Sequence, residues 1–246
     1  MRALLALVAA LVLATPAAAA NGKALYGRYC QSCHGSQGEG STGQPVGGSA
    51  ARDQTQFVGK GPSLRGVGRL AADFYLRTGY MPLKRNGLQP RRSRLVLEPA
   101  EIDALVNYVA SLGPGPGVPN VHPEAGDVSE GMHLFRENCA GCHQIVAEGG
   151  YVTGAVPPAL GAATATQIAE AVRIGPYVMP RFSKKQISDR ELNSIVRYVR
   201  YAQHPDNRGG LALGNIGPIP EGLVSWFLAG TVLIGVCMLI GRRLRG

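Results

Sequence analysis

Two copies of the pattern Cys-x-x-Cys-His constrain this chain more than any other feature of its sequence. The first is Cys30-Gln-Ser-Cys33-His34 and the second is Cys139-Ala-Gly-Cys142-His143. In this pattern each cysteine can form a thioether with a haem vinyl group, and the histidine that follows can ligate the iron. We therefore expect two covalent c-type haems, with the following attachment and axial residues: Cys30, Cys33, Cys139 and Cys142, and His34 and His143.

Two other chemistries also use closely spaced cysteines. A zinc site would need four ligands gathered from both motifs, and more than a hundred residues separate them. A thioredoxin-like redox motif would need a strand–helix–strand context and no histidine. Each motif instead has its own downstream methionine, which favours two separate haem sites.

The ends of the chain are both apolar, but to different lengths. Residues 1–20 hold one early basic residue, an apolar run and a small-residue stretch before Asn21, the features of a cleaved secretory signal peptide. An uncleaved anchor is the alternative, although the run is shorter than the ~20 residues that span a bilayer. Export agrees with the haem motifs, since bacteria form haem thioethers outside the cytoplasm.

Residues 222–241 predict a transmembrane anchor. No charge occurs from Leu223 to Gly241, and as a helix this run covers roughly 28 Å, the thickness of a bilayer core. A buried helix of a soluble protein is the alternative. The arginines of the tail, residues 242–246, favour a cytoplasmic C-terminus. We therefore expect a single-pass cell-membrane protein whose haem domains lie on the extracytoplasmic side.

An internal repeat fills the region between these ends. Gly22 and Gly131 each lie eight residues before the first cysteine of a motif, and Leu25-Tyr26 matches Leu134-Phe135. The later correspondences are Pro62-Ser-Leu64 with Pro158-Ala-Leu160, helical stretches 71–77 with 166–173, Met81-Pro82 with Met179-Pro180, and closing helices 102–112 with 192–202. Each half therefore has the order helix, haem motif, loop, methionine, closing helix, and in this it resembles a small class I cytochrome c domain.

The repeat leads to an all-α fold with two tandem class I cytochrome c domains followed by one C-terminal transmembrane helix. The first and last helices of each domain should cross beside the haem. The expected boundaries are domain 1 at 22–113, a linker at 114–126, domain 2 at 127–206 and a Gly/Pro-rich connector at 207–221. The loop from Gly35 to Gly61 is long for a compact domain.

Met81 and Met179 are the candidate distal iron ligands. A thioether opposite imidazole completes six-coordinate iron and raises its reduction potential, and each residue lies before a proline in a loop. The remaining methionines are the initiator, one on an incoming helix and one in the anchor: Met1, Met132 and Met238. Core packing is the alternative role for a methionine, and the competing ligands are His122, His133 and His204.

The charge is unevenly distributed. Residues 22–113 hold 12 Lys+Arg and 6 Asp+Glu, a balance of +6, whereas residues 114–221 hold 9 and 10, a balance of −1. The excess gathers in Lys84, Arg85, Arg91, Arg92 and Arg94. It is either a solvated loop or a surface that steers the protein towards an acidic partner or anionic lipid headgroups. Nucleic acid is excluded for an exported haem protein.

The mature chain resembles the dihaem cytochrome c subunit of the actinobacterial-type menaquinol–cytochrome c reductase, a cytochrome bc complex. The resemblance is carried by the haem motifs, by Arg77-Thr-Gly-Tyr-Met-Pro-Leu83 and Gly175-Pro-Tyr-Val-Met-Pro180, and most specifically by Gly209-Gly-Leu-Ala-Leu-Gly-Asn-Ile-Gly-Pro-Ile-Pro-Glu-Gly222. The 35–61 loop is longer than that family leads us to expect.

The resemblance implies an electron-transfer subunit with no catalysis of its own. Such a subunit takes electrons from a Rieske iron–sulfur protein and passes them through two haems to the copper-containing subunit of a cytochrome c oxidase. A cytochrome b subunit is the further implied partner. The rival functions are a dihaem carrier of another respiratory complex and a dihaem peroxidase, which would need an open iron site that two Met-Pro loops argue against.

Overall fold

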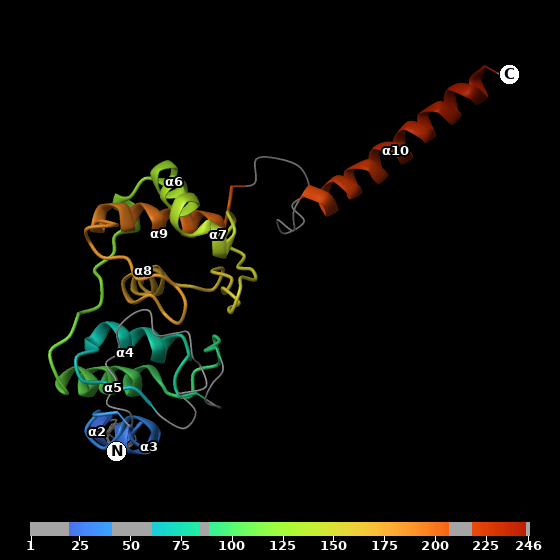
Figure 1. Cartoon of the computed structure of the whole chain (residues 1–246). Helices are drawn as coiled ribbons and strands as arrows, with labels where there is room; N and C mark the ends of the chain where they lie inside the picture. The colour runs from blue at the N-terminus through green and yellow to red at the C-terminus, as the bar shows by residue number, and fades with distance from the viewer. Residues whose placement is uncertain (1–19, 41–60, 84–88, 207–217, 245–246) are drawn as a thin grey trace, which may run out of the picture. The chain divides into compact units, whose positions relative to one another are not determined.

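The structure is a computed structural model that describes residues 20–40, 61–83, 89–206 and 218–244. These ranges are helical and contain no strand, and an isolated bridge joins Val152 to Ala155. The chain divides into two units, residues 1–204 and 205–246 (Figure 1). The expected all-α class is therefore confirmed. The predicted signal peptide falls almost entirely outside the described residues, as do Lys84, Arg85 and most of the 35–61 loop.

The described residues of the first repeat form the helices α2 (Gly22–Tyr29), α3 (Gln31–His34), α4 (Gly68–Arg77) and α5 (Pro99–Ser111). The side chain of Asn21 caps α2 by accepting a hydrogen bond from the amide of Ala24. A proline opens α5, where its missing N–H costs nothing. The buried core joins α2, α4 and α5 through Tyr26, Ala72, Leu97, Ile102, Leu105, Val106 and Val109.

The second repeat has the same order, with α6 (Val128–Asn138), α7 (Ala140–His143), α8 (Ala165–Ile174) and α9 (Asp189–Gln203). A short 3₁₀ helix, η2 (Pro123–Ala125), precedes it. Thr164 and Ser188 cap α8 and α9, each with a Gln or Glu three residues on that completes a capping box. The core includes Phe135, Ile168, Ala169, Val172, Leu192, Ile195, Val196 and Val199.

The first and last helices of each repeat cross at a glycine. A Cβ added at Gly22 would lie 2.2 Å from the carbonyl oxygen of Ala104 on α5, and one added at Gly131 would lie 1.9 Å from that of Ser194 on α9. Only a residue without a side chain lets the backbones approach this closely. The expected crossing of first and last helices is thus present in both repeats.

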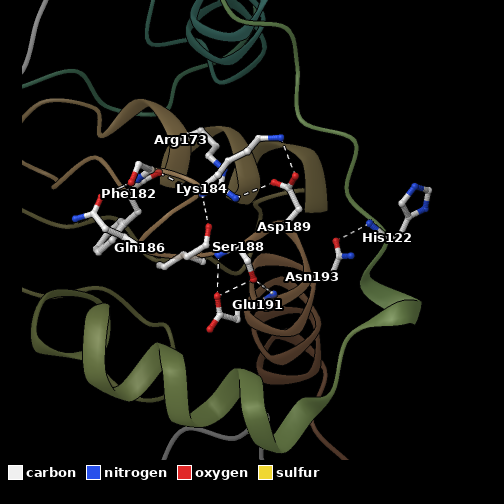
Figure 2. Close-up of polar contacts among 11 residues, drawn as sticks. His122, Arg173, Phe182, Lys184, Gln186, Ser188, Asp189, Glu191 and Asn193 are labelled. Carbon is white, nitrogen blue, oxygen red and sulfur yellow. Dashed lines mark hydrogen bonds and ion pairs between the residues drawn. The ribbon is translucent and has the colours of Figure 1, made fainter.

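The two repeats meet through α4 and α8, which are the same helix of each repeat and lie side by side in Figure 1. The residues that join the repeats are fixed at both ends. The amide of Leu70 on α4 donates to the carbonyl of Pro116 at 3.1 Å. The amide of His122 donates to the side chain of Asn193 on α9 at 2.9 Å (Figure 2).

The second unit contains α10 (Pro218–Arg243). It begins four residues before the expected anchor, because Pro218 and Pro220 occupy a first turn that needs no amide donors. An 18-residue run within Gly222–Arg243 has mean hydropathy 2.4 and is not buried within the described structure. Large side chains such as Trp226, Phe227 and Leu233 are exposed along it, so the helix is long and apolar enough to span a membrane.

Candidate haem sites

The two Cys-x-x-Cys-His motifs adopt the same local structure. Cys30 ends α2 and starts the single turn α3 with φ −121° and ψ −37°, while Cys139 ends α6 and starts α7 with φ −126° and ψ −37°. This break between two helices puts the second cysteine and the histidine on a turn of their own. All four cysteines are free thiols, so each motif offers two sulfurs for thioether formation.

Both motif histidines are held in the same way. Nδ1 of His34 lies 2.7 Å from the carbonyl oxygen of Pro62, and Nδ1 of His143 lies 3.1 Å from that of Pro158. A carbonyl can only accept, so Nδ1 carries the proton and the lone pair is left on Nε2. Burial lowers the pKa of both rings, which keeps them neutral, as an iron ligand must be.

The first cysteine of each motif is not a reactive thiolate. Burial, together with the neighbouring Cys33, raises the pKa of Cys30 to about 11. Burial and the neighbouring Cys142 raise the pKa of Cys139 to about 12. Catalytic and disulfide-exchanging cysteines have a lowered pKa instead, and the described residues around both motifs form helices and loops, without the strands of a thioredoxin-like site. The environment suits a neutral sulfur such as a thioether.

The candidate methionines occupy equivalent loops. Met81 follows α4, and its amide donates to the carbonyl of Tyr75 at 3.0 Å. Met179 follows α8, packs against the second core cluster, and donates to the carbonyl of Pro176 at 3.1 Å. Both side chains are half-buried. The bond to Tyr75 fixes the Met81 loop to α4, whereas the bond to Pro176 closes a turn within the loop that carries Met179.

Arg173 of α8 binds the chain that follows Met179, and Figure 2 shows it beside Phe182 and Asp189. Its guanidinium donates to the carbonyls of Phe182 at 3.2 Å and Ile187 at 2.7 Å, and to the carboxylate of Asp189 at 2.9 Å. Lys184 also donates to Asp189 at 2.7 Å. One buried cation therefore ties the chain after Met179 to the start of α9.

Two tyrosine hydroxyls hold the chain that follows each motif, a role that sequence reasoning missed. The hydroxyl of Tyr26 donates to the carbonyl of Gly35 at 2.7 Å, and that of Tyr198 donates to Ile145 at 2.6 Å. The donor comes from the first helix in one repeat and from the last helix in the other. Phe135 stands in the first helix of repeat two where repeat one has Tyr26. The aligned residues could therefore have shown that the hydroxyl donor of repeat two must come from another helix.

The three histidines that compete as iron ligands are all exposed. Two of them contact acidic side chains, and the third lies at the end of a helix. The rings of His122 and His133 contact Glu124 and Glu137 at 3.1 and 3.2 Å. His204 is exposed at the end of α9. Within the described ranges, no three His, Cys, Asp or Glu side chains gather in a way that could hold a bare metal ion. The donors present, one neutral imidazole and two thiols per repeat, fit a haem.

Comparison with protein families identifies each repeat. The family model described as Cytochrome c matches residues 19–113, and the model described as Cytochrome C oxidase, cbb3-type, subunit III matches residues 126–199. The chain thus contains two cytochrome c domains, which confirms the expected fold. Two such domains indicate binding of c-type haem, one in each.

Curated relatives cover nearly the whole chain. The cytochrome bc1 complex cytochrome c subunit of Mycobacterium tuberculosis (strain H37Rv) is 35% identical over 90% of this chain and 77% of that protein. The protein of the same description from Corynebacterium efficiens is 35% identical over 91% and 76%. The Cbb3-type cytochrome c oxidase subunit CcoP of Azospirillum sp. is 27% identical over 74% and 61%.

Proposed function

This chain belongs to the family of cytochrome bc1 complex cytochrome c subunits, and from that membership we propose that it is the dihaem electron-transfer subunit of a membrane quinol–cytochrome c reductase. The observation that carries the proposal is the 35% identity over 90% of the chain, joined to two cytochrome c domains and an apolar C-terminal helix. Electrons would enter from a Rieske iron–sulfur protein and leave to a cytochrome c oxidase.

The residues that would hold the cofactors follow from the repeat. Cys30 with Cys33, and Cys139 with Cys142, would each form two thioethers to one haem. The ligand pairs would be His34 with Met81 and His143 with Met179. When bound, haem supplies a one-electron ferric/ferrous couple, whose potential rises with a methionine ligand.

The protein's own contribution is orientation and exclusion of water. The carbonyls of Pro62 and Pro158 fix the tautomer of the two histidines, and the crossed helices place an apolar core behind each motif. The tyrosine hydroxyls and Arg173 hold the loops that carry the axial residues. Loops held in this way would limit the reorganisation of the site when an electron arrives.

The proposed topology is a single pass with both cytochrome domains outside the cytoplasm. Arg242 and Arg243 lie in the last turn of α10, where cytoplasmic basic residues stop a membrane segment. The same cations also complement the negative end of the helix dipole. The implied partners in the complex are the cytochrome b subunit and the Rieske subunit.

The decisive experiment is gentle detergent purification through a tag on this chain, with mass spectrometry of the companions. We expect a cytochrome b subunit, a Rieske subunit and an oxidase with a copper-containing subunit. The match of residues 126–199 to a cbb3-type oxidase subunit makes that oxidase the specific alternative. Recovery of cbb3-type oxidase subunits without cytochrome b would overturn the proposal in favour of the other respiratory complex.

A further inference from the structure

The contact between the two cytochrome c domains is a built polar interface. The side-chain amide of Gln89 makes two hydrogen bonds of 2.8 Å with the backbone N–H and C=O of Val156. Arg92 donates to the side chain of Gln167 at 2.9 Å, and Gln167 donates to the carbonyl of Arg77 at 3.3 Å. Arg92 is one of the basic residues that could have steered the protein towards a partner. It is instead bound to the neighbouring domain.

Two carboxyl groups are buried on the two helices that meet at this interface, α8 and α4. Glu170 of α8 is fully buried, with 0% of its surface exposed, and Asp73 of α4 is 8% exposed. Neither carboxylate oxygen of Glu170 has a hydrogen-bond donor within the described part of the chain. A buried ionised carboxylate without a donor is among the most costly arrangements in a protein interior.

The neighbouring cations are already engaged elsewhere. Arg77 of α4 pairs with Asp73 at 2.9 Å and with Asp103 of α5. Arg173, one turn along α8, binds Asp189 at the start of α9 and two carbonyls through its two terminal nitrogens, while its buried Nε has no acceptor among the described residues. Arg92 of the loop before α5 binds Gln167. Among the described groups, Asp73 and Arg77 are the charges that act on Glu170, and Arg77 is shared between two other carboxylates.

A single proton resolves this arrangement. Two ionised carboxylates are both acceptors, so they cannot hydrogen-bond to each other, whereas a protonated carboxyl donates to an ionised one. Burial first, and then the charge of Asp73 and a hydrogen bond to it, raise the pKa of Glu170 to about 9, against a smaller opposing effect of Arg77. Carboxyl pairs in other proteins share one proton for the same reason.

We propose that Glu170 and Asp73 form a proton-binding site between the two cytochrome c domains, which holds one proton at neutral pH and joins α8 to α4 by a carboxyl–carboxylate hydrogen bond. The contact between the domains is therefore proton-dependent. If separation exposes Glu170 and restores its ordinary pKa near 4.5, the closed interface binds one proton more than the open one. The ratio of closed to open molecules then falls by up to tenfold per pH unit between about 4.5 and about 9.

The direct test is infrared spectroscopy of the full chain with both haems bound, in a lipid nanodisc. The wild type should show the carbonyl band of a protonated carboxylic acid at pH 7, which disappears with a midpoint near 9. Haem propionates contribute bands of their own, so the Glu170 band is assigned from the difference between wild-type and variant spectra. It should be absent from Glu170→Gln and retained in Glu124→Gln, whose carboxylate is 74% exposed.

The variant Asp73→Asn distinguishes the proton site from a role in packing alone. An amide at this position removes the negative charge and offers a donor to Glu170, so the midpoint of the carboxyl band should move to lower pH. A purely structural role for Asp73 would leave the midpoint unchanged. Either of two results would overturn the proposal. In the first, the wild-type spectrum at pH 7 has no carboxyl band that disappears in Glu170→Gln. In the second, the carboxyl band of Asp73→Asn has the same midpoint as that of the wild type.

The effect on the domain contact is measured with nitroxide labels at Ser111→Cys and Arg200→Cys, one in each domain, in a Cys237→Ser background with ferrous haems. Dipolar distances should broaden in the wild type as pH rises from 7 towards 9, and should change little at higher pH. Glu170→Gln should keep a narrow distribution throughout, because its amide donates to Asp73 at every pH. Identical behaviour of both proteins would show that the proton does not hold the domains together.

Discussion

Replacing Gly131 by alanine should separate the two helices that frame the second domain. The new methyl group would lie 1.9 Å from the carbonyl oxygen of Ser194, 2.5 Å from its carbonyl carbon and 2.9 Å from Cβ of Tyr198. Two of these are backbone atoms in the middle of α9, so no side chain can turn away. Ordinary contact begins at 3.4 Å, and α6 and α9 must therefore move apart by about 1.5 Å at this point.

The magnitude follows from two opposing effects. Overpacking a well-packed core costs about 1–3 kcal/mol, and the value here belongs at the upper end because the obstacle is backbone. Replacing glycine by alanine inside a helix returns about 1 kcal/mol. We expect a net loss of about 2 kcal/mol, which lowers the melting temperature of a domain of this size by roughly 10 °C. Gly22→Ala, at 2.2 Å from Ala104, should do the same to the first domain.

The assay is guanidinium unfolding of the full chain followed by circular dichroism, with hydrogen exchange of α6 and α9 peptides to assign the loss to the second domain. Gly27→Ala is the matched control, because its new Cβ would meet only the end of the Gln31 side chain at 3.5 Å. That variant should gain about 0.5–1 kcal/mol. If Gly131→Ala unfolds at the wild-type denaturant concentration, the crossing does not depend on a missing side chain.

Four further outcomes are expected. Cys30→Ala with Cys33→Ala should leave one haem per chain by mass spectrometry, and a chain with two would refute the assignment of that motif. Met81→Ala and Met179→Ala should each abolish one sulfur-to-iron absorption band and lower one reduction potential, whereas unchanged spectra would point to another ligand. Lys184 and Arg173 hold the pKa of Asp189 below its usual 3.8. Ionised Asp189 therefore stabilises the folded protein above pH 3.8, and this stabilisation is lost as pH falls through the lowered pKa. The difference in urea stability between wild type and Asp189→Asn should accordingly shrink from pH 7 to pH 3, and a constant difference would contradict this. Deleting residues 207–246 should release a soluble dihaem fragment, and persistent membrane attachment would indicate a second anchor.

The sequence was sufficient for the features that repeat. The repeated order of elements, through its resemblance to a class I cytochrome c domain, predicted the crossed helices, and the apolar positions of both closing helices became core residues such as Leu105 and Ile195. These features depend on local periodicity, which a single sequence displays. The haem ligands themselves remain predictions, to which the carbonyl-bound histidines lend physical support.

The contacts between the repeats could not be predicted. Glu170 aligns with Phe74 when Arg173 is matched to Arg77, so nothing in the repeat pattern marks it as a partner of Asp73. Arg92 looked like part of a solvated basic loop, but it meets Gln167 across 75 positions of sequence. Long-range pairs of polar side chains leave no periodic trace, since they depend on how whole domains pack.

The segment between the domains, fixed at Pro116 and near His122, has a consequence for how the domains find each other. Two separate carrier proteins collide at a rate set by their abundance, but two modules on a short tether see each other at an effective concentration in the millimolar range. A weak contact is then enough to keep them together at any dilution. The chain can therefore use a small polar interface with buried acids, an arrangement too costly for free partners that must meet by diffusion.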